Sequence, residues 1–250
     1  MKSEPTHRMY ETLGVTDLAS EGIRPGGLRL TQRALVLADL PVESRIIDMG
    51  CGAGVTSEFV TLNYGYQVVG IDRSAQLLQR CGTRKNVGPF VRGEGQYLPF
   101  VDKCADGIVA ECALSVIGYS DHLLNELHRV LRFDGKLIVT DVYTRNEKSE
   151  PFWESFPVDC CIRGAISKNQ IFSKLERCGF EIDVWEDHSD ALKEFAIRMI
   201  LLYGSMDKFW SQMSGGILEV SQIREVFSGI KPGYFLLIAH KSGSRSTANI

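Results

Sequence analysis

The stretch "IIDMGCGAGVTSEFV" at residues 46–60 decides the fold. It begins with a short apolar run, continues through a glycine-rich turn, and ends in a segment with helical spacing. Glycines at such a turn adopt positive φ and let the backbone approach a ligand closely. The stretch therefore predicts a strand, a ligand-binding loop and a helix in succession.

Acidic residues in and after this loop indicate which ligand it favours. Asp48 stands at the loop entrance, where it would oppose the phosphates of a dinucleotide. S-adenosylmethionine (SAM) fits better, because it carries an ammonium and a sulfonium group and no phosphate. Asp72 ends the run "VVGID" and can accept both ribose hydroxyls, as it also would in an NAD site. In "GEGQYLPF" (93–100), Glu94 can accept the adenine amino group beside Gly95, and an exposed turn acid is the alternative.

Short apolar runs alternate with longer amphipathic segments along the chain. This alternation is typical of a parallel sheet that helices cover on both faces. The expected strands lie within 44–50, 66–72, 88–94, 105–117, 135–143, 181–189 and 233–241, and the expected helices are 56–64, 74–84, 120–131, 169–180 and 191–213.

Composition excludes several classes of protein. The 250 residues are 44% hydrophobic, which suits one domain with a full core. The net charge of -3, without a long basic run, argues against a nucleic-acid partner. No apolar stretch is long enough for a membrane span, and no secretory signal opens the chain. Seven cysteines without C-x-x-C pairs predict a reduced, cytoplasmic setting, and no histidine–carboxylate cluster has metal spacing, so no metal is expected.

Four segments together resemble the class I SAM-dependent methyltransferases of the quinone-, sterol- and arsenite-methylating type. They are "IIDMGCGAG", "VVGIDRS", "GEGQYLPF" and "HRVLRFDGKLIVTD", and they span roughly residues 40–145. The turn "RFDGK" departs from the Pro-Gly-Gly usual in the family, and Glu94 stands where Asp is more usual. The resemblance implies a Rossmann-like, mostly parallel sheet of seven strands in the order 3-2-1-4-5-7-6, with strand 7 antiparallel.

The resemblance also implies SAM as methyl donor and S-adenosylhomocysteine (SAH) as product. It places the methionine end at Asp48 and the loop glycines, the ribose at Asp72, the adenine at Glu94 and Gly95, and cofactor-edge and substrate contacts after strand 4. The expected cofactor-binding residues are Asp48, Gly50, Cys51, Gly52, Gly54, Asp72, Arg73, Glu94, Gly95, Gln96, Glu111, Cys112 and Leu114.

One methyltransferase domain is expected over residues 1–250. It comprises an N-terminal lid segment (1–40), a SAM-binding core (41–145), and acceptor-side cap helices with strands 6 and 7 (146–245). The expected activity is methyl transfer to a small-molecule acceptor by a monomer or homodimer, with no membrane partner. Three alternatives stay open: a metalloid acceptor held by Cys161, an NAD-dependent oxidoreductase, and a SAM-binding regulator without turnover.

Methyl transfer from a sulfonium is an in-line displacement, which depends mainly on positioning and desolvation. A general base is needed only when the acceptor must lose a proton, so no strict catalytic motif is expected. Arg24, in "EGIRPGGLRLT" (21–31), is a first candidate, since it could hold a carboxylate of the cofactor or of the acceptor. A solvent-exposed turn is the alternative.

Cys161 is a second candidate, in "FPVDCCIRGAIS" (156–167). This segment resembles one in arsenite methyltransferases, and a metalloid requires two or three converging thiolates. However, Ser57 stands where those enzymes carry a cysteine, and no cysteine follows Cys178. Buried apolar thiols are the alternative for Cys161 and the adjacent Cys160.

His188, in "WEDHSD" (185–190), is a third candidate, as a general base that a neighbouring acid would orient. The alternative is a polar helix entry, in which Ser189 or Asp190 caps the helix that follows. The pattern favours the cap.

Overall fold

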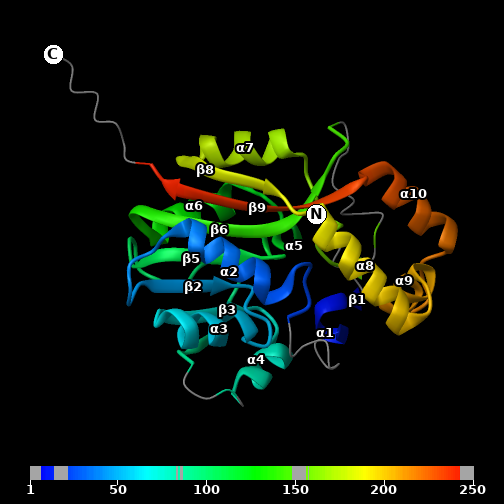
Figure 1. Cartoon of the computed structure of the whole chain (residues 1–250), viewed down its shortest axis with the longest axis horizontal. Helices are drawn as coiled ribbons and strands as arrows, with labels where there is room; N and C mark the ends of the chain where they lie inside the picture. Colours follow the sequence, from blue (N-terminus) through cyan, green and yellow to red (C-terminus); the bar gives the residue numbers. More distant parts are fainter. Residues whose placement is uncertain are drawn as a thin grey trace.

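The computed structural model describes residues 7–13, 22–82, 84, 87–147, 156 and 158–242. Within these ranges, one sheet has seven strands in the order β4-β3-β2-β5-β6-β9-β8 (Figure 1). Their bounds are β2 (Arg45–Met49), β3 (Gln67–Asp72), β4 (Phe90–Arg92), β5 (Ala105–Glu111), β6 (Leu131–Thr144), β8 (Phe180–Asp187) and β9 (Pro232–Lys241).

The predicted topology is confirmed. Numbered along the chain, these strands follow the order 3-2-1-4-5-7-6, and β9 runs antiparallel to both β6 and β8. The turn "RFDGK" forms an irregularity at the start of β6. There the pairing with β5 shifts register between Ala105 and Gly107, and Asp134 has a φ of 63°.

Helices cover both faces of the sheet, as the continuous apolar strands predict. In Figure 1, α2 lies in front of the sheet and α6 behind it. Neighbouring residues of β5 belong to opposite layers: Val109 packs in the cluster that includes α2 and α3, and Ile108 in the cluster that includes α6 and α7. The helices of these two layers are α2 (Gly27–Ala38), α3 (Val55–Tyr64), α4 (Ala75–Cys81), α5 (Leu114–Ile117), α6 (Asp121–Val130) and α7 (Lys168–Arg177).

The helix expected over 191–213 is wrong as a single element. The structure has α8 (Ser189–Tyr203) and α9 (Met206–Met213), separated at Gly204. Gly204 adopts a φ of 87°, and the Ser205 side chain accepts a hydrogen bond from the Lys208 amide, which starts a new helix. The sequence assigns no element to 214–232, where α10 (Val220–Ile230) forms.

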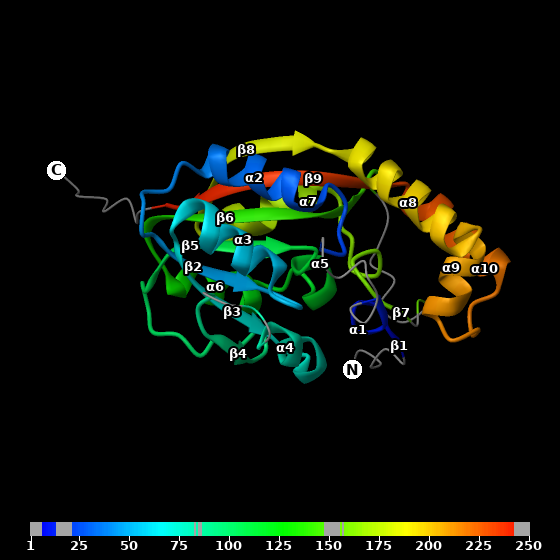
Figure 2. The ribbon, with the colours of Figure 1, turned by 60° about the horizontal axis from the view of Figure 1, so that its bottom comes forward.

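These three helices extend past one end of the sheet, beside the N-terminal segment (Figure 2). That segment contains β1 (His7–Arg8) and α1 (Met9–Leu13), and β1 pairs in parallel with β7 (Val158–Asp159). Met9, Phe156 and Trp210 belong to one hydrophobic cluster, so the N-terminal segment and the C-terminal helices pack together. Parts of the expected lid segment, at 1–6 and 14–21, lie outside the described residues.

None of the described helices is both long and apolar enough to cross a bilayer.

Candidate functional site

The glycine loop joins β2 to α3 at the carboxyl end of the sheet. Gly50, Gly52 and Gly54 have φ values of 74°, 54° and 77°, which disfavour any other residue. A Cβ at Gly54 would also lie 2.8 Å from the ring of Phe90. The amides of Gly50 and Cys51 both donate to the Ile71 carbonyl, at 2.8 and 3.1 Å, so the loop is held against β3.

A cavity of about 320 Å³ opens beside this loop, at the carboxyl ends of β2, β3 and β5. All but two of the expected cofactor-binding residues line it. The exceptions are Gly54, behind the loop, and Leu114, which is fully buried in the α6 layer. The residues on the wall are Asp48, Gly50, Cys51, Gly52, Asp72, Arg73, Glu94, Gly95, Gln96, Glu111 and Cys112.

Arg24 lies in the cavity wall and is 9% exposed, which excludes the solvent-exposed turn. Its Nη2 donates to Thr31 Oγ1 at 2.7 Å and pairs with Glu111 Oε2 at 2.8 Å. Glu111 also accepts hydrogen bonds from Thr31 at 2.7 Å and Thr56 at 2.6 Å. Arg24 Nε is buried and has no hydrogen-bond partner within the described part of the chain.

Asp48 is buried beneath the loop at 3% exposure. Ser57 Oγ donates to its Oδ2 at 2.6 Å. Burial raises the pKa of Asp48 to about 7; the hydrogen bond from Ser57 opposes this shift, and the charge of Glu111 adds to it. A cationic ligand group nearby would stabilise the ionised carboxylate.

Asp72 ends β3 at the opposite side of the loop. Its carboxylate accepts hydrogen bonds from the amides of Gly52 at 2.9 Å and Ser74 at 2.8 Å. A carboxylate offers about four acceptor positions, so two remain for a pair of hydroxyls. The next residue, Arg73, pairs with Asp159 of β7 and so connects the cofactor side of the cavity to the cap.

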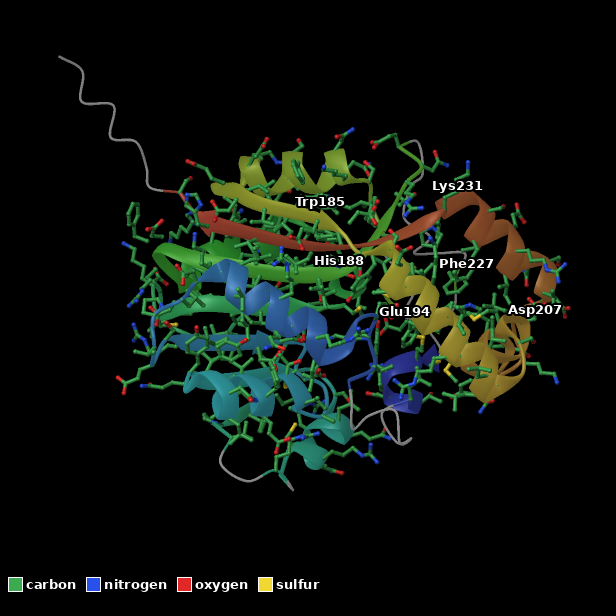
Figure 3. All side chains as sticks on the ribbon, in the orientation of Figure 1. Trp185, His188, Glu194, Asp207, Phe227 and Lys231 are labelled. Carbon is green, nitrogen blue, oxygen red and sulfur yellow. The ribbon has the colours of Figure 1, made fainter. Side chains whose placement is uncertain are left out.

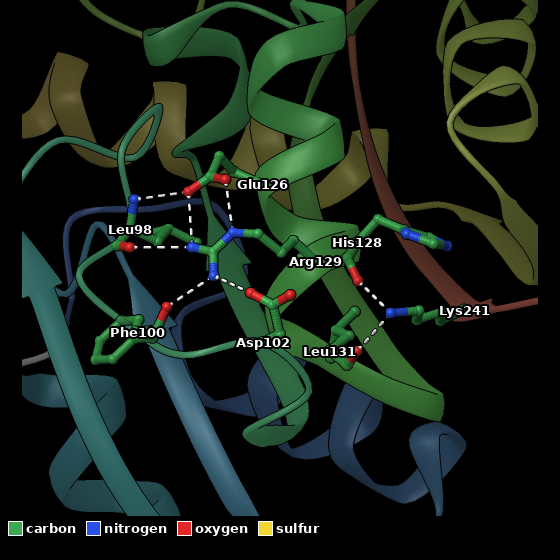
Figure 4. A network of polar contacts seen from close by, with 8 residues as sticks. All are labelled: Leu98, Phe100, Asp102, Glu126, His128, Arg129, Leu131 and Lys241. Carbon is green, nitrogen blue, oxygen red and sulfur yellow. Dashed lines mark hydrogen bonds and ion pairs between the residues drawn. The ribbon is translucent and has the colours of Figure 1, made fainter.

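The segment 93–100 is held in place by α6 (Figure 4). Arg129 donates to the carbonyls of Leu98 and Phe100, at 3.1 and 2.8 Å, and to Glu126. Glu126 in turn accepts from the Leu98 amide at 3.0 Å. The sequence analysis missed this network, although Glu126 and Arg129 are three residues apart in the helix, a spacing at which side chains meet.

The cavity wall also contains residues that the sequence did not indicate. They are Arg8, Tyr10, Glu11 and Asp159. They converge because β1 pairs with β7. A parallel pair only two residues long leaves no periodic pattern in the sequence from which it could be predicted.

Cys161 does not line the cavity and is 8% exposed, in agreement with a buried thiol. Its neighbour is nevertheless another thiol. The ligand atoms of Cys112, Asp141 and Cys161 all lie within 4.8 Å of one another. The sequence predicts no metal, because no cluster of histidines and carboxylates in it has metal spacing.

His188 lies at the junction of β8 and α8, outside the cavity wall (Figure 3). Its Nε2 is 2.8 Å from Glu186 Oε2. The prediction that Ser189 or Asp190 caps α8 is wrong. The Asp187 carboxylate instead accepts a hydrogen bond from the amide of Ser189, at 2.8 Å. Ser189 Oγ instead accepts from the Tyr234 amide at 3.2 Å, because β9 runs alongside.

Comparison with known proteins finds relatives among methyltransferases. Residues 47–139 match the family described as a methyltransferase domain. The chain is 24% identical to an arsenite methyltransferase of Halobacterium salinarum, over 54% of this chain but only 37% of that protein. It is 25% identical to a demethylmenaquinone methyltransferase of Corynebacterium kroppenstedtii, over 88% and 93% of the two chains. The structure of Haemonchus contortus phosphoethanolamine N-methyltransferase 2 with SAM superposes with a TM-score of 0.66, at 17% identity, over 94% of this chain and 60% of that one.

Proposed function

We propose that the chain, whose residues 47–139 match a methyltransferase domain, is a class I SAM-dependent methyltransferase of the small-molecule type, and that its cavity divides between cofactor and acceptor. SAM supplies an electrophilic methyl group on a sulfonium. In our proposal, the methionine end lies at Asp48, Glu111 and Arg24, the ribose at Asp72, and the adenine at segment 93–100. The acceptor then enters from the side of Tyr10.

The main support for this proposal is the set of charged residues on the cavity wall. Asp48, Glu111 and Asp72 are carboxyl groups on the wall, and Arg24 is the cation that pairs with one of them. The excess of carboxylate suits a ligand with an ammonium and a sulfonium group, and it would repel a diphosphate. The buried Nε of Arg24, without a partner among the described residues, is a donor suited to the ligand carboxylate.

The acceptor side supports a small acceptor. The paired strands β1 and β7 place Arg8 and Asp159 at this side of the cavity, next to Tyr10. In our proposal this side of the cavity positions the acceptor, on which a displacement at a methyl carbon depends more than on a base.

Turnover tests the proposal. Purified protein is incubated with SAM and the small-molecule fraction of a cell extract, and SAH formation is followed by mass spectrometry. We expect SAH to form only when the extract is present, to be lost in Asp72→Ala, and to persist in Asp207→Ala. Asp207 is a matched control because it lies on α9, away from the cavity (Figure 3).

A methyl-labelled cofactor then identifies the acceptor from the labelled product. Intact SAH binding without turnover on any fraction would contradict the proposal and favour a regulator that binds the cofactor without using it.

A further inference from the structure

Three segments bring two thiols together at the acceptor end of the cavity. Cys112 follows β5, Cys161 follows β7, and Asp141 lies in β6 between them. Their ligand atoms all lie within 4.8 Å of one another, and all three side chains are buried. Cys112 also lines the cavity, so one thiol of the pair borders it.

A buried tyrosine hydroxyl interacts with the same cluster, chiefly through the Asp141 carboxylate, and the Cys112 thiol already contacts the Tyr234 hydroxyl at 3.2 Å. Tyr119 is 5% exposed, and its hydroxyl interacts electrostatically with Asp141, Cys112 and Cys161. This hydroxyl has no hydrogen-bond partner within the described ranges. A buried hydroxyl without a partner costs stability, and such groups often mark a position that a water, an ion or a substrate fills.

The chemistry of the ligand atoms indicates which kind of ion the cluster would bind. Thiolates bind zinc-type and other soft ions, whereas magnesium and calcium select oxygen ligands. Asp141 already accepts hydrogen bonds from the Ser115 amide at 2.9 Å and the Val142 amide at 2.7 Å. Those bonds fix its carboxylate, so we assign the ligation to the two sulfur atoms and treat Asp141 as a fixed neighbouring charge.

We propose that Cys112 and Cys161 form a binding site for a thiophilic divalent ion of the zinc and cadmium type, beside the unpartnered hydroxyl of Tyr119. Each thiol releases its proton to solvent as its sulfur binds the ion. The site lies at the acceptor end of the cavity and does not depend on methyl transfer, so it can be tested without a known acceptor.

The test is titration of the fully reduced protein with Cd²⁺, followed by the near-ultraviolet absorbance of the cadmium–thiolate bond, with Mg²⁺ as the hard-ion control. We expect Cys112→Ser and Cys161→Ser each to bind one equivalent of Cd²⁺ less than the unsubstituted protein. Cys160→Ser is the matched control, since Cys160 is adjacent to Cys161 and fully buried. It should keep the full stoichiometry.

A second control addresses the other pair of neighbouring thiols, Cys51 and Cys81, which hydrogen-bond beneath the glycine loop. Cys81→Ser removes that pair and should leave the equivalent bound by Cys112 and Cys161 in place. An unchanged stoichiometry in both Cys112→Ser and Cys161→Ser would overturn the proposal.

Two measurements guard against a variant that fails to fold. SAH binding by Cys161→Ser checks its fold, because Cys161 does not line the cavity. Cadmium NMR of the unsubstituted protein reports the ligand atoms directly. Sulfur ligation supports the site, and oxygen ligation alone contradicts it, whatever the result for methyl transfer.

Discussion

Arg24 and Glu111 form a buried ion pair, with 2.8 Å between Nη2 and Oε2 and side chains 8% and 6% exposed. The pair joins the segment before α2 to the end of β5. It therefore links the first part of the chain to the cofactor wall of the cavity.

Breaking this pair should destabilise the fold. Glu111→Gln keeps one oxygen acceptor where Thr31 and Thr56 each use one, and it leaves the buried Arg24 without its counter-charge. We expect a loss of about 3 kcal/mol in the free energy of unfolding, measured with urea. Glu194→Gln is the control, because Glu194 pairs with Arg29 on the exposed surface, and it should cost at most about 1 kcal/mol. Equal effects of the two variants would contradict the assignment of a buried pair.

Asp48 should lower the stability of the ligand-free protein at high pH. Its pKa is raised from 3.8 to about 7, so between these values the folded state keeps a proton that the unfolded chain releases. The resulting stability is present at low pH and is lost as pH rises toward 7, by about 4 kcal/mol in all. We expect Asp48→Asn to be more stable than the unsubstituted protein at pH 8 and to differ less at pH 4. Parallel pH profiles of the two proteins would contradict this account.

The same carboxyl group should make cofactor binding depend on pH. A bound ammonium group favours ionised Asp48, so below pH 7 SAH must displace a proton, and its affinity should fall by up to about tenfold per pH unit. Calorimetry between about pH 5.5 and 7.5 measures this slope, and Asp48→Asn should bind weakly with a flatter profile. A constant affinity in the unsubstituted protein would exclude Asp48 as the group that senses the ligand charge.

Arg73 and Asp159 should slow release of the cofactor. Their ion pair connects the end of β3 to β7, and both residues line the cavity. Asp159→Asn should raise the SAH dissociation rate about fivefold, equivalent to about 1 kcal/mol for a partly exposed pair. Stopped-flow displacement measures it. An unchanged rate would mean that the cap closes without this contact.

A control for that experiment breaks an ion pair away from the cavity. Asp207→Asn removes the pair with Arg224 between α9 and α10, and we expect it to leave the dissociation rate unchanged.

The sequence predicts the sheet well because its signals are local. Continuous apolar runs such as the one containing Ile108 and Val109 indicate strands buried on both faces, and the acids Asp48 and Asp72 stand at the carboxyl ends of strands 1 and 2. The break at Gly204 was also readable, since a glycine followed by a serine is typical of one helix ending and another beginning.

The acceptor side could not be predicted in the same way. Tyr10, Asp159 and the meeting of Cys112 with Cys161 depend on the pairing of β1 with β7 and on the return of the chain after β6. These contacts join residues that are distant in the chain, and no periodicity within either segment specifies the partner. For His188 the local pattern was misleading. The neighbouring acids suggest a general base, but the residue lies outside the cavity wall.

The measurement that tests the cofactor site most directly is SAH binding by calorimetry, with NADH as the control ligand. The arrangement predicts that the unsubstituted protein and Asp207→Ala bind SAH, that Asp72→Ala loses most of this affinity, and that NADH does not bind. Unchanged SAH affinity in Asp72→Ala, or binding of NADH in place of SAH, would contradict it.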